Sequence, residues 1–170
     1  MSKRKRHIIV VLATIALLVT AGTAYGYGET WGGWFTSGTI YYNNNPYTWS
    51  GSGGSVKDTT GGTTDLFYIT SAVPTLPFTY GTDTIFLAVN SFNGSKPTGQ
   101  TGTKGGGGNW GGSYYIKSSA QSGNISGTWL ASFDYSNNPP TYRGGWTVTS
   151  ATPPIQRGDG SSVGQRVAFW

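Results

Sequence analysis

The chain has 170 residues, of which 28 are Gly, 11 Tyr and 7 Trp, and only 10% are charged. It contains no Cys, and its one His is His7. A Ser-His-Asp or Cys-His nucleophile, a Cys/His zinc site and a disulfide are therefore excluded for the chain beyond His7. Four of the eleven basic residues lie at positions 3–6, which leaves seven against six acidic residues. This near-neutral balance predicts that nucleic acid is not a partner.

The first 26 residues have the pattern of a secretory signal peptide. Basic residues at 3–6 precede an apolar run at 8–21, and small residues follow at 22–26. We expect cleavage before Tyr25 or Tyr27. The alternative is an uncleaved signal-anchor, because the stretch from 8 to 24 just reaches the length of about 17 residues that a membrane span needs. Either outcome predicts a secreted or cell-surface protein, which meets the membrane only through an uncleaved N-terminal segment.

Residues 27–170 predict a single all-β extracellular domain, with an antiparallel β-sandwich or jelly-roll-like fold. Short runs of Val, Ile, Thr and aromatic residues are bounded by Gly, Asn and Pro, and no stretch has the apolar spacing of a helix. Glycine-rich and Asn-Pro stretches, such as 43–46, 50–54 and 158–160, are predicted turns. The predicted strands are 34–42, 47–50, 65–71, 82–90, 113–118, 127–135, 145–150 and 163–170.

Alternation within some strands predicts which side chains face the core. Trp129, Ala131, Phe133 and Tyr135 share one face of 127–135. Val163, Val167 and Phe169 share a face in the same way. The run at 82–90 is more continuously apolar, which favours a strand buried on both sides.

Residues 95–112 are predicted to form a glycine-rich loop. The spacing of Gly106, Gly108 and Gly111 matches the dinucleotide fingerprint, but no strand-to-helix turn is expected here, so we expect no nucleotide. Two interpretations remain: a flexible connection without a ligand, or a mobile loop that presents Trp110, with Tyr114 and Tyr115 at its base.

Aromatic residues are the candidate ligand-binding groups. Aromatic rings among Asn, Ser and Thr suit saccharides, because rings stack on apolar sugar faces while amides and hydroxyls bond the hydroxyl groups. In composition and pattern the chain resembles secreted β-sandwich modules such as carbohydrate-binding modules and surface-fibre subunits. The candidates are Trp31, Trp34, Trp49, Trp110, Tyr114 and Tyr115.

The acidic residues offer little catalytic chemistry, and we expect neither enzymatic activity nor a cofactor. Glycoside hydrolysis needs two carboxylates, and only Asp83 with Asp134 is a plausible pair. Calcium is the alternative to no cofactor, with Asp134 beside Asn137 and Asn138, or with Asp58, as oxygen ligands.

The sequence therefore predicts a non-catalytic secreted or surface protein with a structural or adhesive role. Self-association by strand pairing is one expected mode. The alternative function is a carbohydrate-binding module that binds surface polysaccharide through exposed Trp and Tyr. Less favoured are a two-aspartate glycoside hydrolase and a small outer-membrane β-barrel, the latter suggested by the aromatic C-terminal strand. Asn93 and Asn124 also fit the N-glycosylation pattern.

Overall fold

The computed structural model describes the backbone of residues 28–61, 64–68, 75–97 and 101–169. It describes the side chains of these residues apart from those at 34, 35, 51–61, 64–68, 97 and 169. The described residues form strands and turns, and none of them belongs to a helix that is long and apolar enough to cross a membrane.

The described part of the chain is all-β, as predicted. The strands are β1 (Gly28–Tyr42), β2 (Asn45–Gly61), β3 (Thr64–Tyr68), β4 (Leu76–Tyr80), β5 (Asp83–Pro97), β6 (Thr103–Ile116), β7 (Gln121–Asp134), β8 (Thr141–Ala151) and β9 (Ile155–Phe169).

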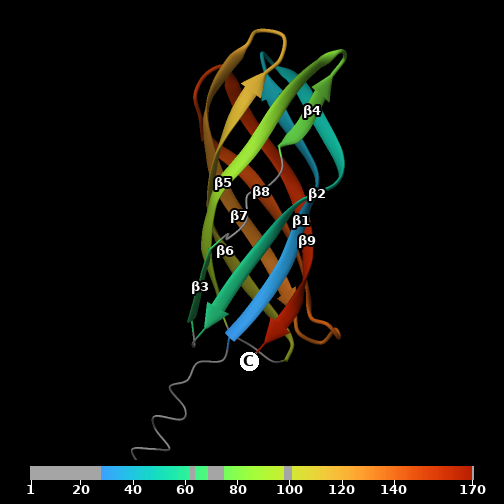
Figure 1. Ribbon diagram of the computed structural model, residues 1–170, viewed down its shortest axis with the longest axis vertical. Coiled ribbons are helices and arrows are strands. Elements are labelled where there is room, and N and C mark those ends of the chain that lie inside the picture. Colours follow the sequence, from blue (N-terminus) through green and yellow to red (C-terminus); the bar gives the residue numbers. More distant parts are fainter. Residues whose placement is uncertain (1–27, 62–63, 69–74, 98–100, 170) are drawn as a thin grey trace, which may run out of the picture.

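One antiparallel sheet contains all nine strands, in the order β3-β5-β4-β2-β1-β9-β8-β7-β6. Because β5 also pairs with β6, the hydrogen-bonded neighbours lead from β5 round the sheet and back to β5. The sheet thus has an inner and an outer face (Figure 1). Among the described strands, β3 alone has a hydrogen-bonded neighbour on one side only.

The two ends of the curled sheet differ in what they contain. At one end, here called the hairpin end, lie the turns that join β1 to β2, β4 to β5, β6 to β7 and β8 to β9 (Figure 1). The turn from β1 to β2 places Asn43 and Asn44 at φ 49° and 62°, left-handed values that Asn tolerates. At the opposite, terminal end β1 begins and β9 ends, with Glu29 paired to Phe169.

Each predicted strand overlaps an observed one, but the observed strands are mostly longer. Residues 50–54 and 158–160, which were predicted to be turns, lie within β2 and β9. The sequence also missed β4, whose Pro77 is unusual in a strand. Pro77 is exposed, while Leu76 and Phe78 on either side of it are buried.

The inner face holds the apolar core. Trp129, Phe133 and Tyr135 are buried on it, which confirms the predicted alternation in β7. The same prediction for β9 is wrong for Val167, which is 57% exposed, and Gly164 and Arg166 occupy inward positions instead. The side chain of Phe169 lies outside the described residues. The buried core residues are Trp31, Ile40, Tyr47, Leu76, Phe78, Ile85, Leu87, Val89, Trp110, Tyr114, Ile116, Ile125, Trp129, Phe133, Tyr135, Trp146 and Ile155.

At Gly94 and Gly106, large rings fill the inner space beside the strand. A Cβ at Gly94 would overlap the ring of Trp129, and a Cβ at Gly106 would lie 2.8 Å from Cε2 of Phe133. Such a separation is too short for two carbon atoms, so only Gly fits beside these rings. The predicted loop at 95–112 is therefore wrong where the chain is described. Its first residues belong to β5, and residues 103–112 belong to β6, which pairs with β7 throughout and with β5 from Gly107 onward.

Candidate functional site

Two aromatic rings lie side by side on the outer face of β5 and β6. Phe86 and Tyr115 are directly paired across the strands, and their ring centroids are 6.4 Å apart with planes only 22° from parallel. Tyr115 is 43% exposed, whereas Phe86 is half-buried. We call this pair the Phe86–Tyr115 platform. The apolar run at 82–90 is therefore not buried on both sides, since Phe86 faces outward.

The platform borders a hollow of about 420 Å³ on the outer face, here called the platform hollow. Hydroxyl and amide groups surround the two rings, and none of the described residues that line the hollow is charged. Such a surface can stack on an apolar ring face and form hydrogen bonds with hydroxyl groups around it. The lining residues are Thr75, Phe86, Ala88, Ser113, Tyr114, Tyr115, Ser122, Gly123 and Asn124.

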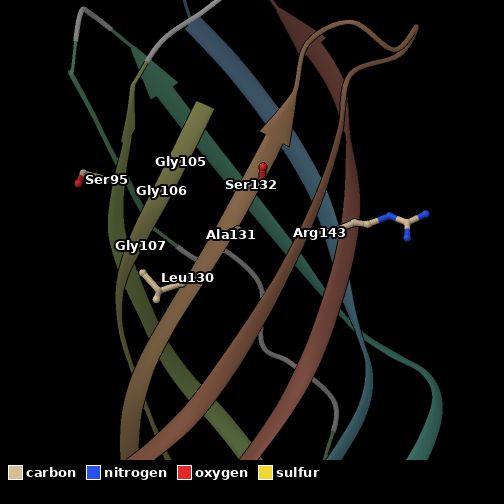
Figure 2. A pocket seen from close by; sticks show the side chains of 8 residues that line it. All are labelled: Ser95, Gly105, Gly106, Gly107, Leu130, Ala131, Ser132 and Arg143. Atoms are coloured by element: carbon tan, nitrogen blue, oxygen red, sulfur yellow. The ribbon is translucent and has the colours of Figure 1, made fainter. Parts of the chain in front are cut away.

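A second hollow, of about 610 Å³, lies on the outer face towards the terminal end (Figure 2). We call it the glycine hollow, because three consecutive glycines of β6 form its floor. Leu130 of the neighbouring strand β7 is 73% exposed, and its side chain lies beside Gly107 of β6. The lining residues are Ser95, Gly105, Gly106, Gly107, Leu130, Ala131, Ser132 and Arg143.

The aromatic residues predicted to bind a ligand are mostly buried. Trp110 is 4% exposed, lies edge-to-face with Trp146 at 5.7 Å, and donates from Nε1 to the carbonyl of Thr147 at 3.2 Å. The prediction that Trp110 is presented to solvent is therefore wrong. Its ring points inward because β6 alternates, and position 110 falls on the inner face.

The other candidates divide between the core and the surface. Trp31 is 2% exposed, and Tyr114 is equally buried, with its hydroxyl donating to the carbonyl of Thr152 at 2.8 Å. Burial, and to a lesser extent Tyr42, raises the pKa of Tyr114. Trp49 is half-buried against Phe78. Trp34 lies in β1, but its side chain is outside the described residues, so Tyr115 is the one candidate with a described, exposed ring.

A cluster of charged side chains lies inside the sheet near the terminal end. Glu29 is fully buried, and its Oε2 accepts hydrogen bonds from Lys96 Nζ, from the Tyr135 hydroxyl at 2.8 Å and from Trp31 Nε1 at 3.1 Å. Its Oε1 accepts from Arg166 at 3.1 Å. We call these residues the Glu29 cluster. Glu29 and Lys96 are not accessible to solvent, and the cluster joins β1, β5 and β9 to Tyr135, the residue that follows β7.

A second carboxylate collects hydrogen bonds at the hairpin end. Asp83 accepts from the Tyr47 hydroxyl at 2.8 Å, from the Thr84 amide at 2.8 Å, and from both the amide and the hydroxyl of Ser118. Burial acts to raise the pKa of Asp83, but these hydrogen bonds outweigh it, and the pKa is lowered. Burial and the Asp83 hydrogen bond raise the pKa of Tyr47 to about 12.

The predicted acidic pair is not assembled. Asp83 lies at the hairpin end, whereas Asp134 pairs with Thr103 at the other end of β6. From Thr103 to Ile116, which pairs with Ile85 of β5, β6 runs thirteen residues, and Asp83 lies beyond that pair. The two carboxylates are therefore separated by at least roughly 43 Å along the strands, at about 3.3 Å per residue, far beyond the ~5–9.5 Å between catalytic carboxylates of glycosidases. Among the described residues no group of three acidic or histidine side chains could hold a metal ion. Asn137 instead donates from its amide to Asp134 at 3.1 Å.

Comparison of the chain with protein-family models, with curated proteins and with solved structures finds no match.

Proposed function

We propose that the chain is a non-catalytic saccharide-binding protein of the cell exterior, which binds its ligand on the Phe86–Tyr115 platform. One observation carries the proposal: two nearly parallel rings, one of them 43% exposed, border an uncharged hollow with hydroxyl and amide groups. Part of the Tyr115 ring is exposed to water, and a saccharide ring can cover it without requiring a charged partner.

The neighbours of the platform supply the polar half of such a site. Ser113 lies in β6 two residues before Tyr115, so the two side chains share a face. Ser122 of β7 pairs directly with Tyr115. Asn124 is exposed two pairs further along, opposite Ser113. Hydroxyl groups donate and accept, and the amide does both through separate atoms, which suits the mixed donor and acceptor character of sugar hydroxyls.

Binding through strand addition has weaker support than binding on this face. Strand addition needs a free sheet edge, and the described sheet closes on itself through the pairing of β5 with β6. Unpaired backbone is left on one side of β3 and on β2 beyond its single pair with β4 at Thr48. An adhesive role remains part of the proposal, with saccharide binding as its physical basis.

The test is binding of the protein from residue 27 onward to a panel of soluble polysaccharides, by affinity electrophoresis and calorimetry. For the polysaccharide that binds, Tyr115→Ala should weaken binding about tenfold, or about 1.4 kcal/mol, whereas Tyr115→Phe should retain most of it because the ring remains.

Tyr80→Ala is the matched control. Tyr80 is 45% exposed, lies in β4 against Tyr47, and is not part of the platform hollow. Binding should be unchanged in this variant. Failure of every polysaccharide to bind, or equal losses in Tyr115→Ala and Tyr80→Ala, would refute the proposal.

A further inference from the structure

We propose that the ligand is an extended, uncharged polysaccharide chain that runs along the outer face of β6, from the platform hollow to the glycine hollow. The inference rests on the proposed saccharide-binding function and adds the length and the charge of the ligand.

The two hollows are aligned on the same three strands. At the platform, β6 contributes Tyr115 between Phe86 of β5 and Ser122 of β7. At the glycine hollow, β6 contributes Gly107 between Ser95 of β5 and Leu130 of β7. Eight residues of β6 separate these two levels, or roughly 26 Å. A ligand that occupies both hollows must therefore be an extended chain of several sugar rings.

The track between the hollows is not obstructed by large side chains. The outward positions of β6 between them are Asn109, Gly111 and Ser113, while the intervening Trp110 points inward. The floor of the track is therefore peptide backbone with small polar groups. A flexible chain can lie on such a floor with its hydroxyl groups close to backbone and side-chain partners.

Gly105 leaves open space above the strand at the glycine hollow, where a ligand can approach the backbone. A Cβ at Gly108 would collide with the carbonyl group of Asn93, so packing within the protein accounts for Gly at that position. A Cβ at Gly105 would have nothing within 4 Å. Gly weakens a strand unless a bend or a close approach requires it, and a ligand lying on the floor of the glycine hollow supplies that close approach.

The lining residues favour an uncharged ligand. The platform hollow has no charged residue among its described lining. The glycine hollow has one, Arg143, whose side chain extends away from the glycine floor (Figure 2). Leu130 instead presents an apolar surface beside that floor, which suits the apolar face of a neutral sugar ring.

The experiment measures affinity against chain length, with β-1,4-linked glucose oligosaccharides from the disaccharide to the octasaccharide and with the binding polysaccharide. Affinity should increase with length until the ligand reaches the glycine hollow. Gly105→Gln fills that hollow from a position with room for a side chain. It should weaken octasaccharide binding about tenfold and leave disaccharide binding unchanged. Thr149→Gln, at an exposed position of β8 outside both hollows, should bind every length as the unmodified protein does.

The outcomes separate this inference from the proposed function. If Tyr115→Ala abolishes binding but short and long oligosaccharides bind equally, the extended ligand is overturned and the platform is kept. The same conclusion follows if Gly105→Gln leaves octasaccharide binding unchanged. Absence of binding at every length, by oligosaccharide and polysaccharide alike, would overturn both. If sedimentation shows a dimer of the ligand-free protein that Gly105→Gln dissociates, the glycine hollow is an interface between copies, and the extended ligand is likewise overturned.

Discussion

At each end of the curled sheet a carboxylate accepts hydrogen bonds from several strands and turns, but the donors at the two ends differ. At the terminal end, fully buried Glu29 is held by Lys96 and Arg166 together with two neutral donors. At the hairpin end, Asp83 is only half-buried and receives its described hydrogen bonds from hydroxyl and amide groups. A carboxylate that loses all contact with water needs cations to offset its desolvation, whereas one that keeps some hydration can be satisfied by neutral donors.

This difference predicts that substitutions at the two ends lower the free energy of unfolding by different amounts and with different pH dependence. Removing one partner at the terminal end leaves a buried charge without its counter-charge. Removing the carboxylate at the hairpin end leaves neutral donors that water can reach. The first change should therefore cost more, and the second should depend more on pH.

The largest effect is expected for Lys96→Met. The substitution leaves Glu29 buried with fewer cations, and we expect a loss of about 3–5 kcal/mol in the free energy of unfolding. Urea unfolding measures it. Lys117→Met, at an exposed turn position, is the control and should stay within about 0.5 kcal/mol of the unmodified protein. A loss below that of Asp83→Asn would reverse the proposed order of the two ends.

Asp83→Asn should have the next largest effect, about 1–3 kcal/mol, because an amide cannot accept from all four donors. The pKa of Asp83 is lowered in the folded protein from its ordinary 3.8. The stability it contributes is therefore present above pH 3.8 and lost as the pH falls below it. Urea unfolding between pH 6 and 2 should show a weaker acid dependence in Asp83→Asn, and an unchanged slope would exclude this role.

Tyr47→Phe tests the same end at alkaline pH, with an expected loss of about 1 kcal/mol at neutral pH. The pKa of Tyr47 is raised from 10.0 to about 12. Its contribution is therefore complete below pH 10 and lost as the pH rises through 12. Absorbance titration should show late-ionising tyrosines, and Tyr47→Phe should remove the contribution near pH 12 while that of Tyr114, whose pKa is also raised, remains. Ionisation of every tyrosine near pH 10 would contradict the Asp83 hydrogen bond.

The smallest effect is expected at Gly105, which lies outside the sites of Glu29 and Asp83. Gly105→Ala should raise the free energy of unfolding by about 0.5–1 kcal/mol, since the methyl group meets open space and restricts the unfolded chain. Gly94→Ala is the matched opposite, because its methyl group would overlap the ring of Trp129. Thermal unfolding should move the two variants in opposite directions, and a shift of the same sign in both would contradict the inner packing.

The sequence predicts the strands better than it predicts the role of glycine. Alternation in β7 is visible in the sequence because Trp129 and Phe133 lie four residues apart in one segment, which is two repeats of the strand. The need for glycine at 94 or 106 arises from rings on a neighbouring strand, so the local sequence of residues 104–112 is typical of a loop. Of the platform, Tyr115 was predicted and Phe86 was not, because their pairing becomes visible only once β5 lies beside β6.

The Glu29 cluster was beyond prediction for a similar reason. Glu29 is a single acidic residue just after the signal pattern, and its partners Lys96 and Arg166 lie 67 and 137 residues further along the chain. No local spacing connects them. A charged residue of a strand can be assigned to the core only after the register of β1 with β9 is known.

The pairing of Glu29 with Phe169 has a consequence for the connectivity of the chain. Since β1 begins beside the end of β9, a short linker between them would close the backbone into a ring. A new start and end could then be placed between Asn43 and Asn44, which are exposed at the opposite end. Such a circular permutant should fold to the same sheet, and it would move both termini away from the Glu29 cluster and from the glycine hollow.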